Sequence, residues 1–192
     1  MKFPVLETER LRLIQIGPEH IDALFEILSK DEVTKYYGMD SLEDRLIAEK
    51  MVEAFQFGFE TQRSYRWGLE VKETGEFIGT VGLNNLNLEA KKTEIGYELH
   101  PAYWRKGLAK EAVLEVLRYS FEELGIYRMG AVTYPANDVS GGMLKGLGFK
   151  EEGKLRGYLY QRGKSHDALI FSLLEPEWKA MKESVRNYRT ER

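Results

Sequence analysis

The chain has 192 residues, of which 43% are hydrophobic and 31% are charged, a balance typical of a globular domain with a substantial core. Its net charge of −3 argues against a general nucleic-acid-binding protein, and the absence of cysteine excludes disulfides, thiolate metal sites and a cysteine nucleophile within the chain. The first residues lack an apolar signal segment and no run approaches the roughly 20 apolar residues of a membrane-spanning helix, so we expect a cytoplasmic protein without a membrane partner.

The first third of the chain reads as one strand followed by two helices. Residues 11–16 are β-rich and end at Gly-Pro, which predicts a strand. Residues 19–30 place their apolar side chains on one side, as an amphipathic helix does. A second helix is expected over residues 41–61, with Ser41 as its N-cap. Between the helices, Tyr36-Tyr37 belongs either to the edge of the core or to a loop that faces a substrate.

Three strands are expected next. Residues 65–72 and 76–84 are joined by a tight turn in which Gly75 can take a positive φ, which predicts a hairpin. A polar loop then leads to a short β-rich segment, residues 93–99, that ends at a proline.

This last strand leads into a basic turn, residues 104–110, and a long helix follows it. Apolar residues at helical spacing run from Leu108 to Gly125, so the helix begins near Gly107. Exposed backbone N–H groups, the positive end of the helix and several cations therefore coincide here, which favours a site for an anion such as a phosphate. The alternative is an ordinary strand-to-helix turn with a solvated basic rim. The cations are Arg105, Lys106 and Lys110.

The remainder reads as a strand, a short helix and two further strands. The expected ranges are 127–134, 138–147, 150–159 and 165–173, and the charged end from residue 175 is either a short helix or frayed. The whole order indicates a mixed α/β sheet, because the long helix between strands supplies a crossover connection.

The short helix carries two polar residues with two possible roles each. Asn137 either caps the helix or uses its amide to hold an extended ligand. Ser140 either serves the first helical turn or points into a cleft. The Gly141-Gly142 pair costs up to about 1 kcal/mol per glycine relative to alanine, so it either weakens the helix or marks the close approach of a ligand or another backbone.

Several ordered blocks resemble the GNAT superfamily of N-acetyltransferases, which transfer an acetyl group from acetyl-CoA to an amine. The family's pyrophosphate loop has the form Gln/Arg-x-x-Gly-x-Gly/Ala, and residues 104–109 match it at Gly107 and Ala109 but carry Trp104 at the first place. That departure is familiar in the RimJ/RimL-like branch, which acetylates ribosomal-protein N-termini. Other blocks similar to this branch are Glu7-Thr8-Glu9-Arg10-Leu11, Glu94-Ile95-Gly96-Tyr97, Asn137-x-x-Ser140 and Leu147-Gly148-Phe149, and the resemblance spans roughly residues 6–178.

The resemblance implies a GNAT-like fold. Its central, twisted, mostly antiparallel sheet would splay between the fourth and fifth strands and be flanked by about four helices. We expect one acetyltransferase domain over residues 1–178 and a charged C-terminal tail over residues 179–192. Acetyl-CoA is expected as co-substrate and an amine as acceptor, with no nucleic-acid partner; a homodimer is left open. No metal is expected, because His20, His100 and His166 are far apart in sequence.

The resemblance also implies which residues hold acetyl-CoA. Main-chain groups of Leu99 would meet the pantetheine arm and act as an oxyanion donor to the acetyl carbonyl, and Asn137 would reach the arm from the other side of the gap. The pyrophosphate would rest on backbone N–H groups of Arg105, Lys106, Gly107, Leu108, Ala109 and Lys110.

The reaction needs a neutral amine. A lysine amine, with a pKa near ~10.4, is almost wholly protonated at neutral pH, whereas an α-amino group near ~7.7 to 8.0 is roughly a tenth neutral. Alternation places Glu94, Gly96 and Glu98 on one face of their strand unless a bulge intervenes. Either glutamate could accept the proton or simply pair with a cation; we favour Glu94 because it matches a glutamate base in some GNAT enzymes. Ser140 either protonates the departing CoA thiolate or is structural.

The sequence therefore predicts an acetyl-CoA-dependent N-acetyltransferase that works by direct transfer in a ternary complex. The expected acceptor is a protein N-terminal α-amino group of the ribosomal-protein type. The alternatives are an acetyltransferase of a small amine, polyamine or antibiotic, and a non-catalytic acyl-CoA-binding module that keeps the phosphate loop without a working base.

Overall fold

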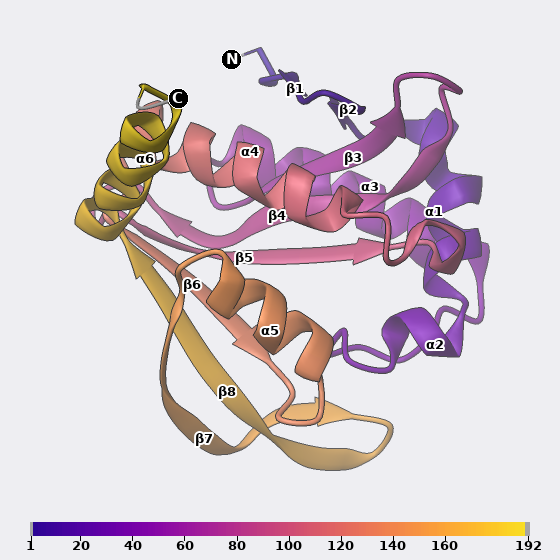
Figure 1. Ribbon diagram of the computed structural model, residues 1–192. Coiled ribbons are helices and arrows are strands. Elements are labelled where there is room, and N and C mark those ends of the chain that lie inside the picture. Colours follow the sequence, from indigo (N-terminus) through magenta and orange to yellow (C-terminus); the bar gives the residue numbers. More distant parts are fainter. Residues whose placement is uncertain (1, 191–192) are drawn as a thin grey trace.

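The computed structural model describes the backbone of residues 2–190 and the side chains of residues 2–183. Eight strands form one sheet in the order β1-β2-β3-β4-β5-β6-β8-β7 (Figure 1). The strands are β1 (Leu6–Glu7), β2 (Leu11–Gln15), β3 (Tyr65–Val71), β4 (Phe77–Asn87), β5 (Lys92–Leu99), β6 (Arg128–Thr133), β7 (Lys150–Gln161) and β8 (Lys164–Leu174). Neighbours are antiparallel except β5 and β6, which are parallel because α4 connects them as a crossover.

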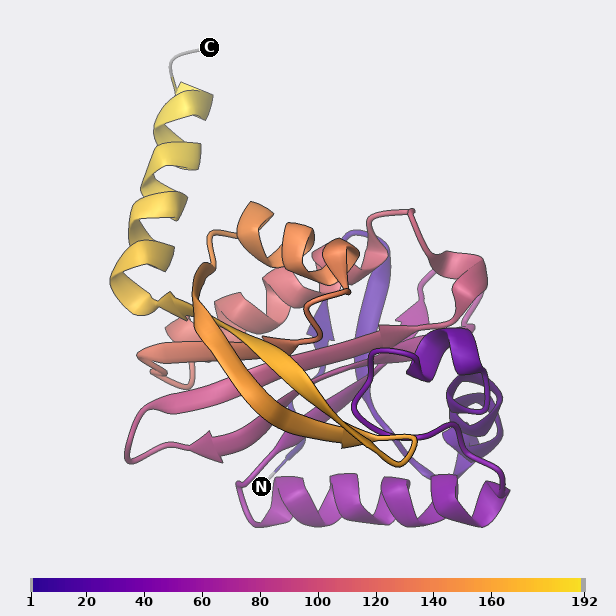
Figure 2. The same ribbon diagram turned by 90° about the horizontal axis from the view of Figure 1, so that it is seen from below.

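Helices cover both faces of the sheet. They are α1 (Ile21–Leu28), α2 (Asp31–Thr34), α3 (Arg45–Glu60), α4 (Leu108–Glu122), α5 (Asp138–Gly146) and α6 (Glu175–Thr190), with short 3-10 turns η1 (Pro18–His20) and η2 (Pro101–Tyr103). In Figure 2, α4 and α5 lie on one side of the sheet and α1 and α3 on the other. The mixed α/β architecture and its largely antiparallel sheet are thus confirmed.

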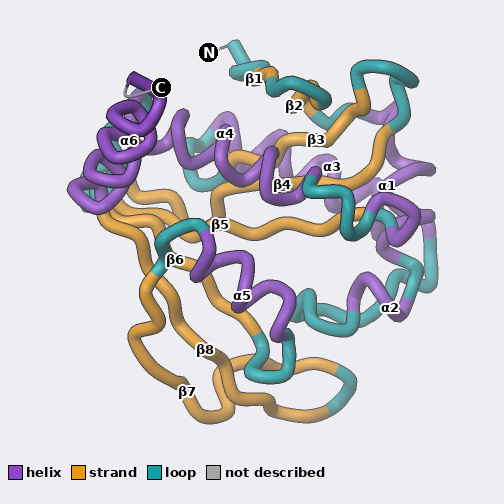
Figure 3. The backbone as a smooth tube through the Cα atoms, in the orientation of Figure 1, coloured by secondary structure: helices purple, strands orange, loops and turns teal. Residues whose placement is uncertain are grey.

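The core has two parts, one on each face. On the α4 side, apolar residues at helical spacing, among them Ala112, Val116 and Leu117, are fully buried against the sheet. On the other side, α1 and α3 bury a smaller cluster that includes Leu24 and Val52. Phe171 and Leu173 of β8 belong to the larger cluster, whereas the far end of the β7–β8 hairpin extends away from both clusters (Figures 1 and 3), and most of β7 is exposed.

One local expectation is wrong, one alternative that was left open is decided, and one strand is new. Helix α3 begins at Arg45 and is capped by Asp44, whose carboxylate accepts the Leu46 N–H, so the prediction of Ser41 as the cap was wrong. Ser41 instead donates to the Asp31 carboxylate at 2.5 Å, a contact across ten residues. The charged end from residue 175 is helical as far as Thr190. The short β1 was not expected, so the splayed pair of strands carries the labels β5 and β6.

Candidate active site

The sheet opens between β5 and β6. The two strands pair only over residues 92–94 and 128–130, as far as the described residues show. Beyond that point β5 stays paired with β4 and β6 stays paired with β8, so residues 95–99 and 131–133 diverge. The predicted splay is therefore confirmed, and it leaves main-chain groups of both strands facing a gap.

A cavity of about 350 Å³ occupies this gap. Alternation along β5 turns Glu94 and Gly96 to the face covered by α1 and α3, and Ile95 and Tyr97 to the face covered by α4 and α5. The register with β4 is continuous from Glu94 to Leu99, so no bulge disturbs this alternation. All four residues line the cavity, which therefore passes from one face of the sheet to the other. Tyr36 and Tyr37 also line it, so their loop faces the cavity.

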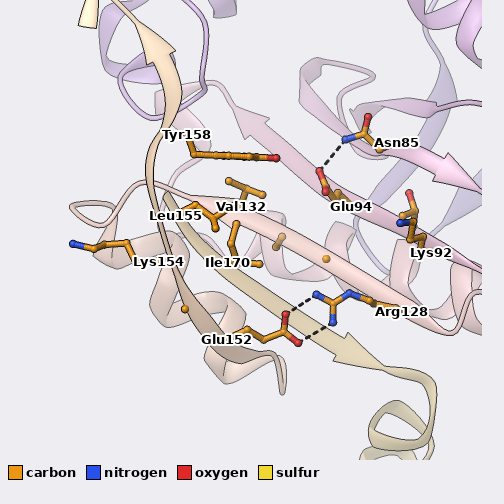
Figure 4. Close-up of a pocket in the computed structure, with 14 residues that line it drawn as sticks. Asn85, Lys92, Glu94, Arg128, Val132, Glu152, Lys154, Leu155, Tyr158 and Ile170 are labelled. Atoms are coloured by element: carbon orange, nitrogen blue, oxygen red, sulfur yellow. Dashed lines mark hydrogen bonds and ion pairs between the residues drawn. The ribbon is translucent and has the colours of Figure 1, made fainter. Parts of the chain in front are cut away.

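A second cavity of about 580 Å³ is shown in Figure 4. It adjoins the first at Glu94, which lines both. It runs between β5 and the edge strand β7, and Tyr158 points across it toward Glu94. Arg128 and Glu152 form an ion pair of 2.6 Å on its floor. Hydrogen bonds from Arg128 and Ser172 lower the pKa of Glu152 to about 2.

Glu94 is partly buried and held in place. The Asn85 amide donates to its Oε2 at 3.1 Å. Gly130, its partner across the β5–β6 pair, makes room for the side chain, since a Cβ at Gly130 would lie 3.1 Å from Glu94 Cγ. The carboxylate thus stands where the two cavities meet.

Glu98 lies on the same face of β5 but in a different environment. Its side chain is only 3% exposed, lies 3.7 Å from the Arg66 guanidinium and accepts a hydrogen bond from Thr80. Burial raises the pKa of Glu98, against the lowering effect of Arg66. Glu98 lines neither cavity within the described side chains, whereas Glu94 lines both, so Glu94 is the better placed of the two to act as the base.

The basic turn before α4 has the geometry of an anion site. Arg105 and Gly107 both have positive φ, 60° and 77°, which turns the backbone tightly into the helix. Asp44 and Asn137 cap α3 and α5 with their side chains, whereas Gly107, the N-cap of α4, has no side chain to do so. The first N–H groups of a fifteen-residue helix are thereby left to an outside acceptor, which fits a pyrophosphate. The two cavities do not reach residues 104–110, most of which are exposed.

This turn is tied to the N-terminal block of the sequence. The Arg10 guanidinium donates to the Lys106 carbonyl at 2.9 Å and forms an ion pair of 2.6 Å with Glu111. Glu111 also accepts from the Thr8 hydroxyl at 2.5 Å. Burial opposes ionisation of Glu111, but these hydrogen bonds outweigh it and lower the pKa. The sequence matched residues 7–11 to a family without assigning them a role, and the structure shows that they fix the turn.

Trp104 and Leu99 are joined at the mouth of the gap. The Trp104 indole donates to the Leu99 carbonyl at 2.8 Å, which attaches the turn to the end of β5. The backbone N–H of His100 donates to the Ile78 carbonyl of β4. Because successive backbone N–H groups of a strand point in opposite directions, the Leu99 N–H points away from β4, toward the gap. The Leu99 carbonyl thus accepts from Trp104, whereas the Leu99 N–H has no partner among the described residues and can donate to a ligand.

On the α5 side of the gap, Asn137 caps the helix by accepting the Ser140 N–H at 3.2 Å. Asn137 and Ser140 both line the cavity as well. The Ser140 and Tyr97 hydroxyls are 2.7 Å apart. Burial raises the pKa of Tyr97, which keeps its phenol protonated. Tyr97 was quoted in a family block but not expected in the site, because the distance along the chain hides its contact with Ser140.

Two further features bear on the expected partners. In the part of the chain that the structure describes, no group of three His, Asp or Glu side chains could hold a metal ion. No helix there is long and apolar enough to cross a membrane.

The chain is similar to curated bacterial proteins. The uncharacterized N-acetyltransferase YoaA of Bacillus subtilis (strain 168) is 41% identical over 174 residues, which cover 91% of this chain and 98% of YoaA. The putative ribosomal N-acetyltransferase YdaF of the same organism is 36% identical over 108 residues, which cover 56% of this chain and 59% of YdaF.

Solved structures share the fold. A probable acetyltransferase superposes with a TM-score of 0.81 at 25% identity and covers 91% of this chain and 99% of its own. Spermidine N-acetyltransferase from Vibrio cholerae, in complex with CoA and spermine, has a TM-score of 0.78 at 19% identity, covering 88% and 98%. The ribosomal α-N-protein acetyltransferase RimL, in complex with coenzyme A, has a TM-score of 0.77 at 17% identity, covering 89% and 98%.

Residues 10–150 match the family model of the acetyltransferase (GNAT) domain, which confirms the resemblance seen in the sequence. The chain belongs to the GNAT family and is an acetyl-CoA-dependent N-acetyltransferase.

Proposed function

We propose that the acceptor is a protein N-terminal α-amino group, as in the ribosomal-protein branch. The observation that carries this proposal is that Glu94 lines both cavities. One cavity crosses the gap, where the acetyl group would arrive. The other leads away between β5 and β7 and offers room for the residues that follow an N-terminus, which a small amine would not need.

The charges of the larger cavity support a polypeptide over a polyamine. A polyamine carries several ammonium groups, and a site for it would gather carboxylates. The charged residues that line this cavity are instead mixed, with three cations and two carboxylates: Lys92, Arg128, Lys154, Glu94 and Glu152. The likeness to a putative ribosomal N-acetyltransferase favours the same acceptor, whereas the likeness to spermidine N-acetyltransferase keeps a polyamine as the rival.

Acetyl-CoA would supply an activated thioester, and the chain would hold it at three places. The uncapped N–H groups at the start of α4 and the cations Arg105, Lys106 and Lys110 would hold the pyrophosphate. Leu99 would offer its N–H to the acetyl carbonyl oxygen, which gains negative charge as the amine attacks. Asn137 would contact the pantetheine arm from α5.

Proton transfers would occur on opposite sides of the gap. Glu94, directly or through one water, accepts the proton that the amine loses as its nitrogen bonds to the acetyl carbon. The carbon–sulfur bond breaks, and the Ser140 hydroxyl gives its proton to the leaving sulfur. The Tyr97 phenol, 2.7 Å away, replaces the proton on Ser140 and takes one in turn from solvent, so both hydroxyls are restored at the end of the cycle.

A panel of acceptors tests the proposal. Release of the CoA thiol would be followed with a peptide that has a free α-amine, the same peptide blocked at its N-terminus but carrying a lysine, and spermidine. We expect turnover with the first peptide, and mass spectrometry should place the acetyl group on its N-terminal residue. Preference for the lysine peptide or for spermidine would refute the proposed acceptor.

Glu94→Gln tests the base. Loss of a positioned general base typically lowers the rate by about 10² to 10⁴. Glu89→Gln is the matched control, since Glu89 is exposed in the turn between β4 and β5 and lines neither cavity within the described side chains. We expect Glu89→Gln to keep full activity. Equal activities of the two variants would remove Glu94 from the reaction.

A further inference from the structure

Arg66 is a nearly buried cation at the cavity of the gap, and it takes no part in the proposed acetyl transfer. It belongs to β3, is 7% exposed and lines the cavity of the gap. Its side chain crosses the sheet over two glycines, because Arg66 pairs with Gly82 and Gly82 pairs with Gly96. A Cβ at Gly82 would lie 2.7 Å from Arg66 Nε, and one at Gly96 would lie 3.8 Å from Nη2. The two glycines therefore open the path by which the guanidinium reaches β5.

The guanidinium keeps unused donors after its contacts are made. Its Nη1 donates to the Gly96 carbonyl at 3.2 Å and to the Thr80 hydroxyl at 3.4 Å, and its Nη2 donates to Asn84 Oδ1 at 2.9 Å. Arginine has five N–H groups, so at least one Nη2 hydrogen has no partner among the described residues. Both Arg66 and Asn84 line the cavity.

This contact also fixes the orientation of Asn84. A guanidinium only donates, so the amide must turn its oxygen to Arg66 and its nitrogen away. The nitrogen lies next to Gly96, where a Cβ would approach it to 3.1 Å. It donates to no other described residue. Asn84 is also the cross-strand partner of Glu94, so two free donors and the candidate base share one face of the sheet at the gap.

We propose that Asn84 Nδ2, supported by Arg66, binds the first carbonyl oxygen of the acceptor, so that this site selects α-aminoacyl groups and rejects polyamines. The inference rests on the proposed acceptor. In such a group the amine nitrogen and carbonyl oxygen are at most about 4 Å apart, so one acceptor residue can meet the carboxylate and the donors together. A polyamine has no oxygen to accept from these donors, and its second ammonium group would meet the guanidinium.

The test compares two acceptors across variants. One is a peptide with a free α-amine, and the other is its analogue with the first carbonyl reduced to methylene. Each acceptor is compared with itself, so the different basicities of the two amines cancel. Asn84→Ala should lower kcat/KM for the peptide about tenfold, the size expected for one lost hydrogen bond, and leave the analogue nearly unchanged. Asn84→Asp should raise kcat/KM for spermidine relative to the peptide.

Asn87→Ala is the matched control. Asn87 lies further along β4, where its side-chain oxygen accepts the Ala90 N–H of the following turn, and it lines neither cavity within the described side chains. Thermal unfolding followed by circular dichroism would show that each variant is folded. Equal losses for peptide and analogue in Asn84→Ala, or no loss for either, would overturn the inference while leaving the proposed acceptor standing. Wild-type protein that acetylates spermidine and no peptide would refute both.

Discussion

Replacing Arg66 by methionine isolates the energetic role of the buried pair beneath the cavity. The Arg66 and Glu98 side chains are 8% and 3% exposed, and Nη1 lies 3.7 Å from Oε2. Methionine is of similar length but uncharged, so the variant leaves the Glu98 carboxylate buried without its cation. Breaking a buried ion pair from one side typically costs about 3–5 kcal/mol of unfolding free energy, and we expect a loss in this range at neutral pH.

The loss should depend on pH, with a sign set by Glu98. Burial raises the pKa of this carboxyl above its usual value of 4.5, although Arg66 opposes the rise. A carboxyl whose pKa is raised by folding holds its proton more tightly in the folded state than in the unfolded state. Its contribution to the stability of the fold is therefore fully present below the pKa of the unfolded state and is lost as pH rises through the pKa of the folded state. Arg66→Met removes the opposing charge and raises the pKa further. The deficit of the variant should therefore grow as pH rises above the usual carboxyl pKa of 4.5, by at most about 1.4 kcal/mol per pH unit.

Urea denaturation followed by circular dichroism at several pH values measures this deficit. The matched variant is Arg66→Met combined with Glu98→Gln, which has no carboxyl left to titrate at that site. Its difference from wild type should vary much less with pH, and above neutral pH it should be more stable than Arg66→Met alone. A deficit of Arg66→Met that is constant across the pH range, or a double variant no more stable than the single one, would refute the reasoning.

Three further predictions concern the turn before α4 and the exposed ion pair. Gly107→Val, at a φ of 77°, distorts the anion site and should weaken acetyl-CoA binding about tenfold or more, as measured by calorimetry. Gly125→Val, at a comparable φ of 67° beyond the other end of α4, should leave binding unchanged. Equal effects of the two variants would mean that the substitutions act only by lowering the stability of the fold. Arg10→Met, which frees the Lys106 carbonyl, should raise the KM for acetyl-CoA several-fold with little change in kcat, and an unchanged KM would contradict the role given to residues 7–11. Arg128→Met should lower the free energy of unfolding by less than about 1 kcal/mol, because the ion pair of Arg128 with Glu152 is exposed. This loss should be present above the ordinary carboxyl pKa and vanish as pH falls toward 2, which is the opposite pH dependence to that of Arg66→Met. A loss that grows on acidification would contradict this prediction.

Features with a local cause could be predicted from the sequence. The glycine that starts α4 follows from backbone sterics and from the apolar spacing after it, and Asn137 caps α5 through a contact three residues away. The alternation that places Glu94 and Glu98 on one face is likewise a local property of a strand.

Features that depend on which strands become neighbours could not be predicted in this way. Nothing near Arg66 in the chain indicates that it crosses Gly82 and Gly96, since that path exists only once β3, β4 and β5 are in register. The burial of Glu98 follows from the same register. Ser41 and Asp44 are both good N-caps, and the choice between them involves the contact of Ser41 with Asp31, ten residues away.

The most direct test of the account is a crystal structure with a conjugate in which CoA is joined through an acetyl linker to the α-nitrogen of a peptide. We predict that the α-nitrogen lies in the gap between β5 and β6, within one hydrogen bond or one bridging water of Glu94, with the first carbonyl oxygen on Asn84 and the following residues in the cavity beside β7. A conjugate whose peptide leaves the gap on the α4 side, or whose α-nitrogen lies beyond the reach of Glu94 and a single water, would contradict the account.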